Sequence, residues 1–157
     1  MRSLFLSLLL SAVFVLPAGA AVDTSKLQLP GDITLEQART VVEGALEFAK
    51  KQGVPMNITV VDAGGNLKAF CRMDGAFLGS IDISQKKAVT ARRFNMSSAE
   101  LGALAQPGKE LFGIEATNGG LAIFGGGELL RDRNGVIIGA IGVSGGSVQE
   151  DTNVAKA

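Results

Sequence analysis

Two pairs of strand-like runs, each joined by a short turn, constrain the fold of this chain most. The runs MNITVVD (56–62) and LKAFCRM (67–73) are rich in strand-forming residues, and the segment between them holds two glycines. The runs LAIFGGGELLRD (121–132) and VIIGAIGVSGG (136–146) flank a tight turn at Asn134-Gly135. Hairpins of this kind predict a mainly antiparallel sheet. The glycines of the second pair indicate places where the backbone passes close to another part of the molecule.

Two long helices are predicted before and between the hairpins. Thr34 and Gln37 have the spacing of a capping box, and apolar residues then recur at helical spacing until Gly53, a natural C-cap. The pattern is helical again from Ser80. One stripe of this second helix carries small or apolar side chains suited to close packing on a sheet: Ile81, Ser84, Ala88 and Ala91.

Two further helices are predicted beside the second hairpin. Ser97 and Glu100 form another capping box, which starts a short helix that ends near Ala105, and Ser147 can cap a last helix, VQEDTNVAKA. The element order is helix, two strands, two helices, two or more strands and helix. With 157 residues and 46% hydrophobic content, this order predicts one α+β domain with helices layered on the sheet.

The first 20 residues, MRSLFLSLLLSAVFVLPAGA, have the pattern of a secretory signal peptide. A basic residue precedes the apolar run 4–16, which is too short for a typical membrane span, and small residues precede the predicted cleavage site near Ala20. We therefore expect residues 21–157 to form one periplasmic or secreted domain without a membrane span. The 14 basic and 15 acidic residues of this domain give a net charge of −1, which argues against nucleic acid as a partner.

Histidine, tyrosine and tryptophan are absent, and Cys71 is the single cysteine. This composition excludes Ser-His-Asp and Cys-His catalysis, histidine-rich zinc sites, and a histidine or tyrosine ligand to haem iron. It also excludes an intramolecular disulfide. The chemistry that remains uses carboxylates, lysine, arginine, hydroxyls, one thiol, methionines and backbone dipoles.

Four segments, in this order and spacing, resemble the GlcG-like haem-binding domain family, whose members are sometimes labelled haem-degrading. They are RMDGA (72–76), GSIDIS (79–84), KAVTA (87–91) and GAIGVSGG (139–146). The resemblance covers about residues 33–155, and the leader indicates a secreted member. It implies a profilin-like fold with a five-stranded, mainly antiparallel sheet between helices, and assembly into homo-oligomers. It also implies binding of haem or iron species as a sensor or carrier.

The resemblance and the residue types together give a set of candidate ligand-binding residues, with no catalytic residue and no metal site assigned. A related domain holds haem with a histidine, so this chain would need another ligand, for which Met73, Met96, Cys71, lysine side chains and the hydroxyl of Ser97 are available. The similarity of NMSSAEL to a secreted relative adds the hydroxyl of Ser98. Arg72 or Lys87 would pair with the haem propionates.

Several residues also have a structural interpretation. Lys87 suits an amphipathic side chain that lies over a mixed surface and reaches water, and Cys71 suits a small buried hydrophobe. Asp62 suits the cap of its own turn, and Asp151 suits compensation of a helix dipole. The two candidate methionines suit gap fillers in the core.

These observations favour an exported protein that binds a small ligand, haem or a related tetrapyrrole or iron species, as a carrier or sensor without turnover. One alternative is a small-molecule enzyme that uses a pocket beside Arg72 and Lys87, with Asp62 or Asp74 as base. Another is an accessory subunit of an exported redox system that binds no ligand itself. The first two hypotheses place the site where LKAFCRM ends.

Overall fold

The computed structural model describes residues 31–157. The predicted signal peptide, residues 1–20, and the first residues of the predicted domain lie outside this part of the chain. The elements in chain order are α1 (Leu35–Gln52), β1 (Asn57–Asp62), β2 (Leu67–Arg72), α2 (Gly79–Phe94), α3 (Ser98–Leu104), the short 3-10 helix η2 (Ile114–Ala116), β3 (Gly127–Arg131), β4 (Ile137–Ser144) and α4 (Val148–Lys156).

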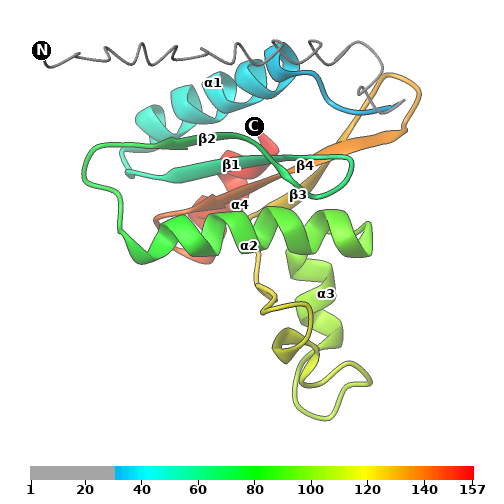
Figure 1. The fold of residues 1–157 in the computed structure, drawn as a ribbon. Helices are drawn as coiled ribbons and strands as arrows, with labels where there is room; N and C mark the ends of the chain where they lie inside the picture. The colour runs from blue at the N-terminus through cyan, green and yellow to red at the C-terminus, as the bar shows by residue number, and fades with distance from the viewer. Residues whose placement is uncertain (1–30) are drawn as a thin grey trace, which may run out of the picture.

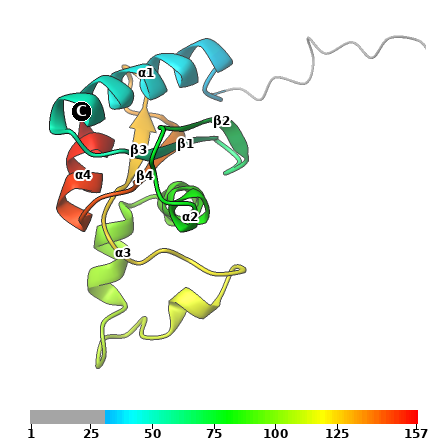
Figure 2. The same cartoon turned by 90° about the vertical axis from the view of Figure 1, so that its left-hand side faces the viewer.

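The strands form one antiparallel sheet in the order β2-β1-β4-β3, so β2 and β3 are its edges. Helix α1 covers one face of the sheet and α2 covers the other (Figures 1 and 2). Ile58 and Val60 of β1 pack with α1 and with Val154 of α4, whereas Val61 packs with Ala88 of α2. The α+β prediction is confirmed, with a core on each side of the sheet.

The predicted fifth strand is absent from residues 31–157, which form four strands. The segment 121–126, predicted as the start of a strand, has no regular structure, because helical side chains bind its backbone. Ala122 N donates to Thr90 Oγ1 of α2 at 3.1 Å, and Phe124 O accepts from Ser98 Oγ at 2.7 Å. Strand β3 therefore begins only at Gly127.

Both hairpins close with the same turn. The Asp62 carboxylate accepts the Gly64 and Asn66 amides at 2.8 Å each, which confirms its predicted capping role. Asp132 caps the second turn in the same way. In each turn one glycine has positive φ, 80° at Gly65 and 81° at Gly135.

The helix boundaries follow from local chemistry. The boxes at Thr34 and Ser97 are both present, Ser147 caps α4 with a third, and Gly53 ends α1 in the left-handed conformation. The stripe of small residues brings α2 directly onto β4, where a side chain at Gly142 would collide with the α2 backbone. Within residues 31–157, no helix combines the length and apolarity needed to cross a bilayer.

Candidate functional site

The structure separates the predicted site residues into two groups. Arg72 and Met73 lie together at the end of β2, one edge of the sheet. Lys87 and Ser98 pack against the start of β3 at the opposite edge, since a side chain at Gly127 would meet both residues. Two strands separate these places, so the pocket predicted beside both Arg72 and Lys87 does not form.

Lys87 is fully buried, which corrects the interpretation of a side chain that reaches water. Its ammonium lies 2.6 Å from Asp151 Oδ2 of α4 and donates to Val143 O of β4 at 3.0 Å. The ring centroid of Phe124 lies 4.8 Å from the same nitrogen. Burial lowers the pKa of Lys87, and the hydrogen bond and charge of Asp151 oppose this shift. The ammonium is therefore not available to pair with a propionate.

Asp151 is a structural anion, and the sequence interpretation of helix-dipole compensation did not identify this role. Besides Lys87, its carboxylate accepts the amides of Gly145 and Gly146 at 3.0 Å each. The sequence signal for this cluster is the glycine run 125–127. In the structure, a side chain at Gly126 would lie 2.9 Å from Lys87 Nζ. The glycine run thus leaves space for a buried lysine, as the predicted close approach of backbone required.

Ser98 is also committed to structure. Its hydroxyl donates to Phe124 O at 2.7 Å and accepts the Gly127 amide at 2.9 Å, and the residue is fully buried. Met96 is half-buried between α2 and α3, next to Asn95 in the left-handed conformation. The predicted ligands Ser98 and Met96 therefore do not join the group at the end of β2.

The group at the end of β2 lines a groove between α1 and β2, here called the α1–β2 groove. It consists of two hollows that share Leu46, with volumes of about 450 and 370 Å³. The first hollow is lined by Leu35, Arg39, Val42, Glu43, Leu46, Lys68, Ala69 and Phe70. The second is lined by Leu46, Lys50, Cys71, Arg72, Met73 and Asp74. Both hollows are shallow and open to solvent, so a ligand would lie along the groove with one side exposed.

Two sulfur atoms lie in the second hollow. Cys71 is a free, half-buried cysteine, and both it and Met73 pack against the core beneath α1. The Met73 sulfur accepts the Met56 amide at 3.3 Å, which fixes it in place. The structural interpretation of Cys71 as a small hydrophobe is therefore correct in part, because its side chain also reaches the wall of a hollow.

The groove carries more basic than acidic side chains. Lys68 is paired with Asp32 at 3.1 Å. Burial raises the pKa of Asp32, but hydrogen bonds from the Ala63 amide and Lys68 outweigh this effect and hold it below its ordinary value. Three further cations have no ion pair among the described residues: Arg39, Lys50 and Arg72. Sequence reasoning identified only Arg72 among them, because the other two fall on a solvated helix face.

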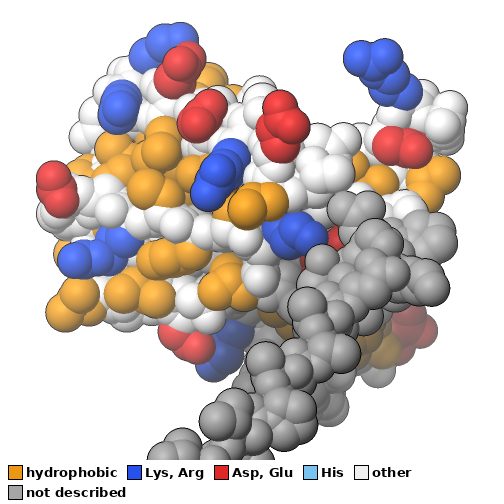
Figure 3. Space-filling view, turned by 45° about the horizontal axis from the view of Figure 1, so that its top comes forward, with side chains coloured by type: hydrophobic (Ala, Val, Ile, Leu, Met, Phe, Trp, Pro, Cys, Tyr) orange, Lys and Arg blue, Asp and Glu red, His pale blue; other side chains and the backbone are white. Residues whose placement is uncertain are grey.

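The rim of the groove is apolar as well as basic. On the face of the molecule that carries α1, hydrophobic side chains lie among Lys and Arg side chains (Figure 3). Leu35 and Phe70, which line the first hollow, are 47% and 38% exposed. The α1–β2 groove thus offers an apolar wall, soft sulfur donors and cations without an ion pair in residues 31–157, a combination that suits a flat apolar anion.

Comparisons with known proteins identify relatives of this chain. A chain of 15.0 kDa from Citrobacter freundii, encoded in the dhaT-dhaS intergenic region and described as uncharacterized, is 39% identical over 132 residues, which cover 84% of this chain and 93% of the relative. The corrinoid adenosyltransferase PduO of Salmonella typhimurium is 36% identical over 84% of this chain, but the match spans only 39% of that enzyme.

A solved structure of a PduOC:heme complex superposes with a TM-score of 0.75 at 35% identity, covering 80% of this chain and 91% of that one. The family model described as haem degrading protein HbpS-like matches residues 33–157, nearly all of the part of the chain that the structure describes. The resemblance noted in the sequence is confirmed, and the chain belongs to the HbpS-like haem-degrading protein family.

Proposed function

We propose that this protein binds haem or a related tetrapyrrole in the α1–β2 groove, as a carrier or sensor and without turnover. The observation that carries the proposal is the meeting of two sulfur atoms with Arg39, Lys50 and Arg72, cations that form no ion pair within residues 31–157, in one groove with apolar walls. The haem complex of PduOC supports the choice of ligand, because that domain shares the fold and 35% of its residues with this chain.

The residues in the groove fit the requirements of the group. The Cys71 sulfur is the preferred ligand to the iron, because the Met73 sulfur already accepts the Met56 amide. Arg72 and Lys50 would pair with the propionates, and apolar contact would stabilise the complex by about 25 cal/mol per Å² buried. The iron, when bound, supplies redox change and ligand exchange, and the chain holds the porphyrin.

Export and assembly belong to the same proposal. The leader at residues 1–20 would direct residues 21–157 to the periplasm or the medium, where haem is scavenged or sensed. The exposed apolar residues beside the groove support a homo-oligomer, because such residues are commonly covered by a second subunit. Mass spectrometry of the N-terminus and native mass of the protein from its host would test both points.

The test of the binding site is a haemin titration of the purified protein, followed by its Soret band. We expect a saturable band, a shifted and weaker band in Cys71→Ala, and weaker affinity in Arg72→Ala through loss of a charged pair. Lys86→Ala is the matched control, because Lys86 pairs with Asp82 on the exposed side of α2. Met96→Ala and Ser98→Ala should keep the wild-type band position if folded.

Two outcomes would overturn the proposal. A wild-type protein without a Soret band at micromolar haemin does not bind haem, and this result would favour the ligand-free accessory subunit. A double variant, Cys71→Ala with Met73→Leu, that keeps the wild-type band position would show that the iron ligand lies outside the α1–β2 groove.

A further inference from the structure

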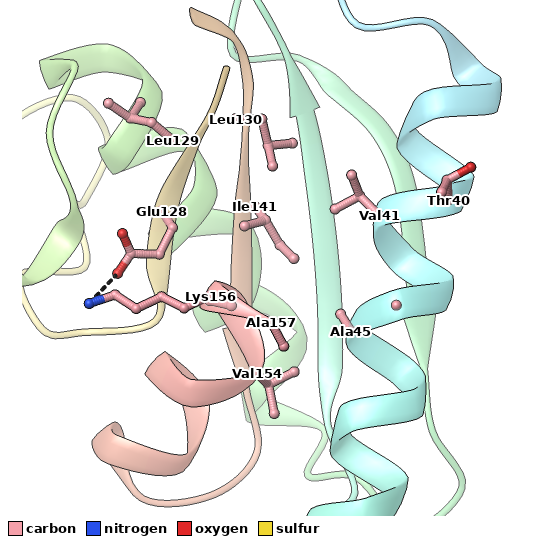
Figure 4. A pocket seen from close by; sticks show the side chains of 12 residues that line it. Thr40, Val41, Ala45, Glu128, Leu129, Leu130, Ile141, Val154, Lys156 and Ala157 are labelled. Atoms are coloured by element: carbon pink, nitrogen blue, oxygen red, sulfur yellow. Dashed lines mark ion pairs between the residues drawn. The ribbon is translucent and has the colours of Figure 1, made fainter. Parts of the chain in front are cut away.

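A separate cavity of about 460 Å³ lies on the other side of α1, between α1, α4 and the β3–β4 hairpin. Val41 and Ala45 of α1 face Ile141 and Val154 across it (Figure 4). No sulfur atom and no aromatic ring lines it, so it does not offer haem the iron ligand that the α1–β2 groove provides. Its walls are aliphatic, apart from Thr40 and the pair Glu128 and Lys156.

Gly44 keeps the mouth of this cavity open. It lies in the middle of α1, where glycine destabilises a helix relative to alanine. Packing does not require the glycine, because a side-chain carbon built there meets nothing within 4 Å, and its φ is not in the left-handed region. Glycine is required elsewhere in this fold, where two backbone segments lie too close for a side chain between them, as at Gly142. Gly44 is exposed at the edge of the cavity, so a side chain introduced there would have open space in front of it.

Glu128 supplies the polar group of the cavity. Its side chain is only 20% exposed, and its nearest cation, Lys156 Nζ, is 3.7 Å away on a side chain that is 63% exposed. Burial raises the pKa of Glu128, the charge of Lys156 opposes this shift, and the charge of Glu100 from α3 adds to it. Glu128 is the acidic side chain that lines this end of the cavity, and the cation nearest to it is the exposed Lys156 at 3.7 Å, which leaves the carboxylate open to a closer cationic ligand.

We infer that this cavity is a second ligand site, which takes a small amine whose aliphatic body lies between α1 and α4 and whose ammonium donates to the Glu128 carboxylate. The inference goes beyond haem binding and does not rest on it. The aliphatic body would contact Leu130, Ile141 and Val154. The ammonium of the ligand would donate a short hydrogen bond to the Glu128 carboxylate. Lys156 lies 3.7 Å from this carboxylate, which is too far for such a bond.

The experiment is an NMR titration of the isotope-labelled protein with three probes of equal length: hexylamine, hexanol and hexanoate at pH 7. We expect saturable shifts at Gly44 and Leu130 with hexylamine, weaker ones with hexanol and none with hexanoate. Glu128→Gln should weaken hexylamine about tenfold or more and leave hexanol unchanged. Glu47→Gln is the matched control, because Glu47 is an exposed carboxylate of α1 outside the cavity.

Gly44→Leu tests the site independently of charge. The leucine should fill the mouth and abolish binding of hexylamine and hexanol, and the absence of neighbours predicts that the variant folds with an unchanged or higher melting temperature. Its haemin titration should match wild type, which separates this site from the α1–β2 groove. The inference is overturned by absence of saturable shifts, by equal affinity for hexylamine and hexanoate, or by full hexylamine binding in Gly44→Leu.

Discussion

The buried pair of Lys87 and Asp151 gives the sharpest test of the structure. Asp151→Asn leaves the Lys87 ammonium fully buried without a carboxylate, and Lys87→Met leaves the carboxylate buried without its cation. Removal of one partner from a buried pair costs about 3–5 kcal/mol in free energy of unfolding. This is a large part of the roughly 5–15 kcal/mol that stabilises a typical domain.

The same helix supplies the control. Lys86 is adjacent to Lys87 and forms an i, i+4 pair with Asp82 at 2.9 Å, but the two side chains are 40% and 66% exposed. Such surface pairs contribute about 0.3–0.5 kcal/mol, so Lys86→Met should hardly change stability. Because the chain lacks tyrosine and tryptophan, urea unfolding should be followed by far-ultraviolet circular dichroism.

The double variant completes the test. With both charges removed, Lys87→Met/Asp151→Asn should be at least about 2 kcal/mol more stable than the sum of the single losses predicts, because neither charge is then left unpaired. The asparagine oxygen can still accept an amide from the 145–146 turn. The reasoning fails if Lys87→Met costs no more than Lys86→Met, or if the two single losses simply add.

Four other changes test separate parts of the structure. Gly142→Ala should lower the free energy of unfolding by about 1–3 kcal/mol, because the new side chain would collide with α2. Gly44→Ala should raise it by about 0.5–1 kcal/mol in the same urea assay, because the new side chain meets no atom and alanine favours the helix. Burial raises the pKa of Glu128 in the folded protein above its ordinary value of 4.5, so ionisation of this carboxyl destabilises the fold as pH rises through the folded pKa. Glu128→Gln removes the ionised group and should therefore raise the melting temperature at pH 7, but not below about pH 4. Asp32→Asn should flatten the loss of stability in acid, since the pKa of Asp32 is held below 3.8 and its contribution is present at neutral pH and lost as pH falls. An unchanged acid titration of stability in Asp32→Asn would contradict the role given to its bond with Lys68.

The parts of the fold that could be predicted from sequence are those set by neighbours in the chain. The boxes at Thr34 and Ser97 and the turn at Asp62 involve groups two to four residues apart, and all formed as predicted. The predicted strand 121–132 starts later than expected for the opposite reason. The backbone of segment 121–126 bonds to Thr90 and Ser98, which lie 26 to 32 residues away from the atoms they bind.

The candidate site was predictable to the same extent. Arg72 and Met73 were identified because they end a strand beside a turn, which is local information. Lys87 was misjudged because its neighbours on α2 suggest a mixed surface, whereas its true surroundings come from Asp151, 64 residues later. Arg39 and Lys50 of α1 fall on the solvent-exposed side of a helical projection, so the sequence does not mark them as site residues. They line the groove only because β2 packs beside α1.

The long separation between Lys87 and Asp151 also sets an order on folding. A nascent chain that has emerged only as far as β4 already contains the ammonium of α2, but the carboxylate that neutralises it has not yet appeared. Closing the sheet at that moment would bury an unpaired charge, so α2 should dock firmly only after residue 151 arrives. The core on the α2 side of the sheet is therefore expected to form fully only after α4 has been synthesised.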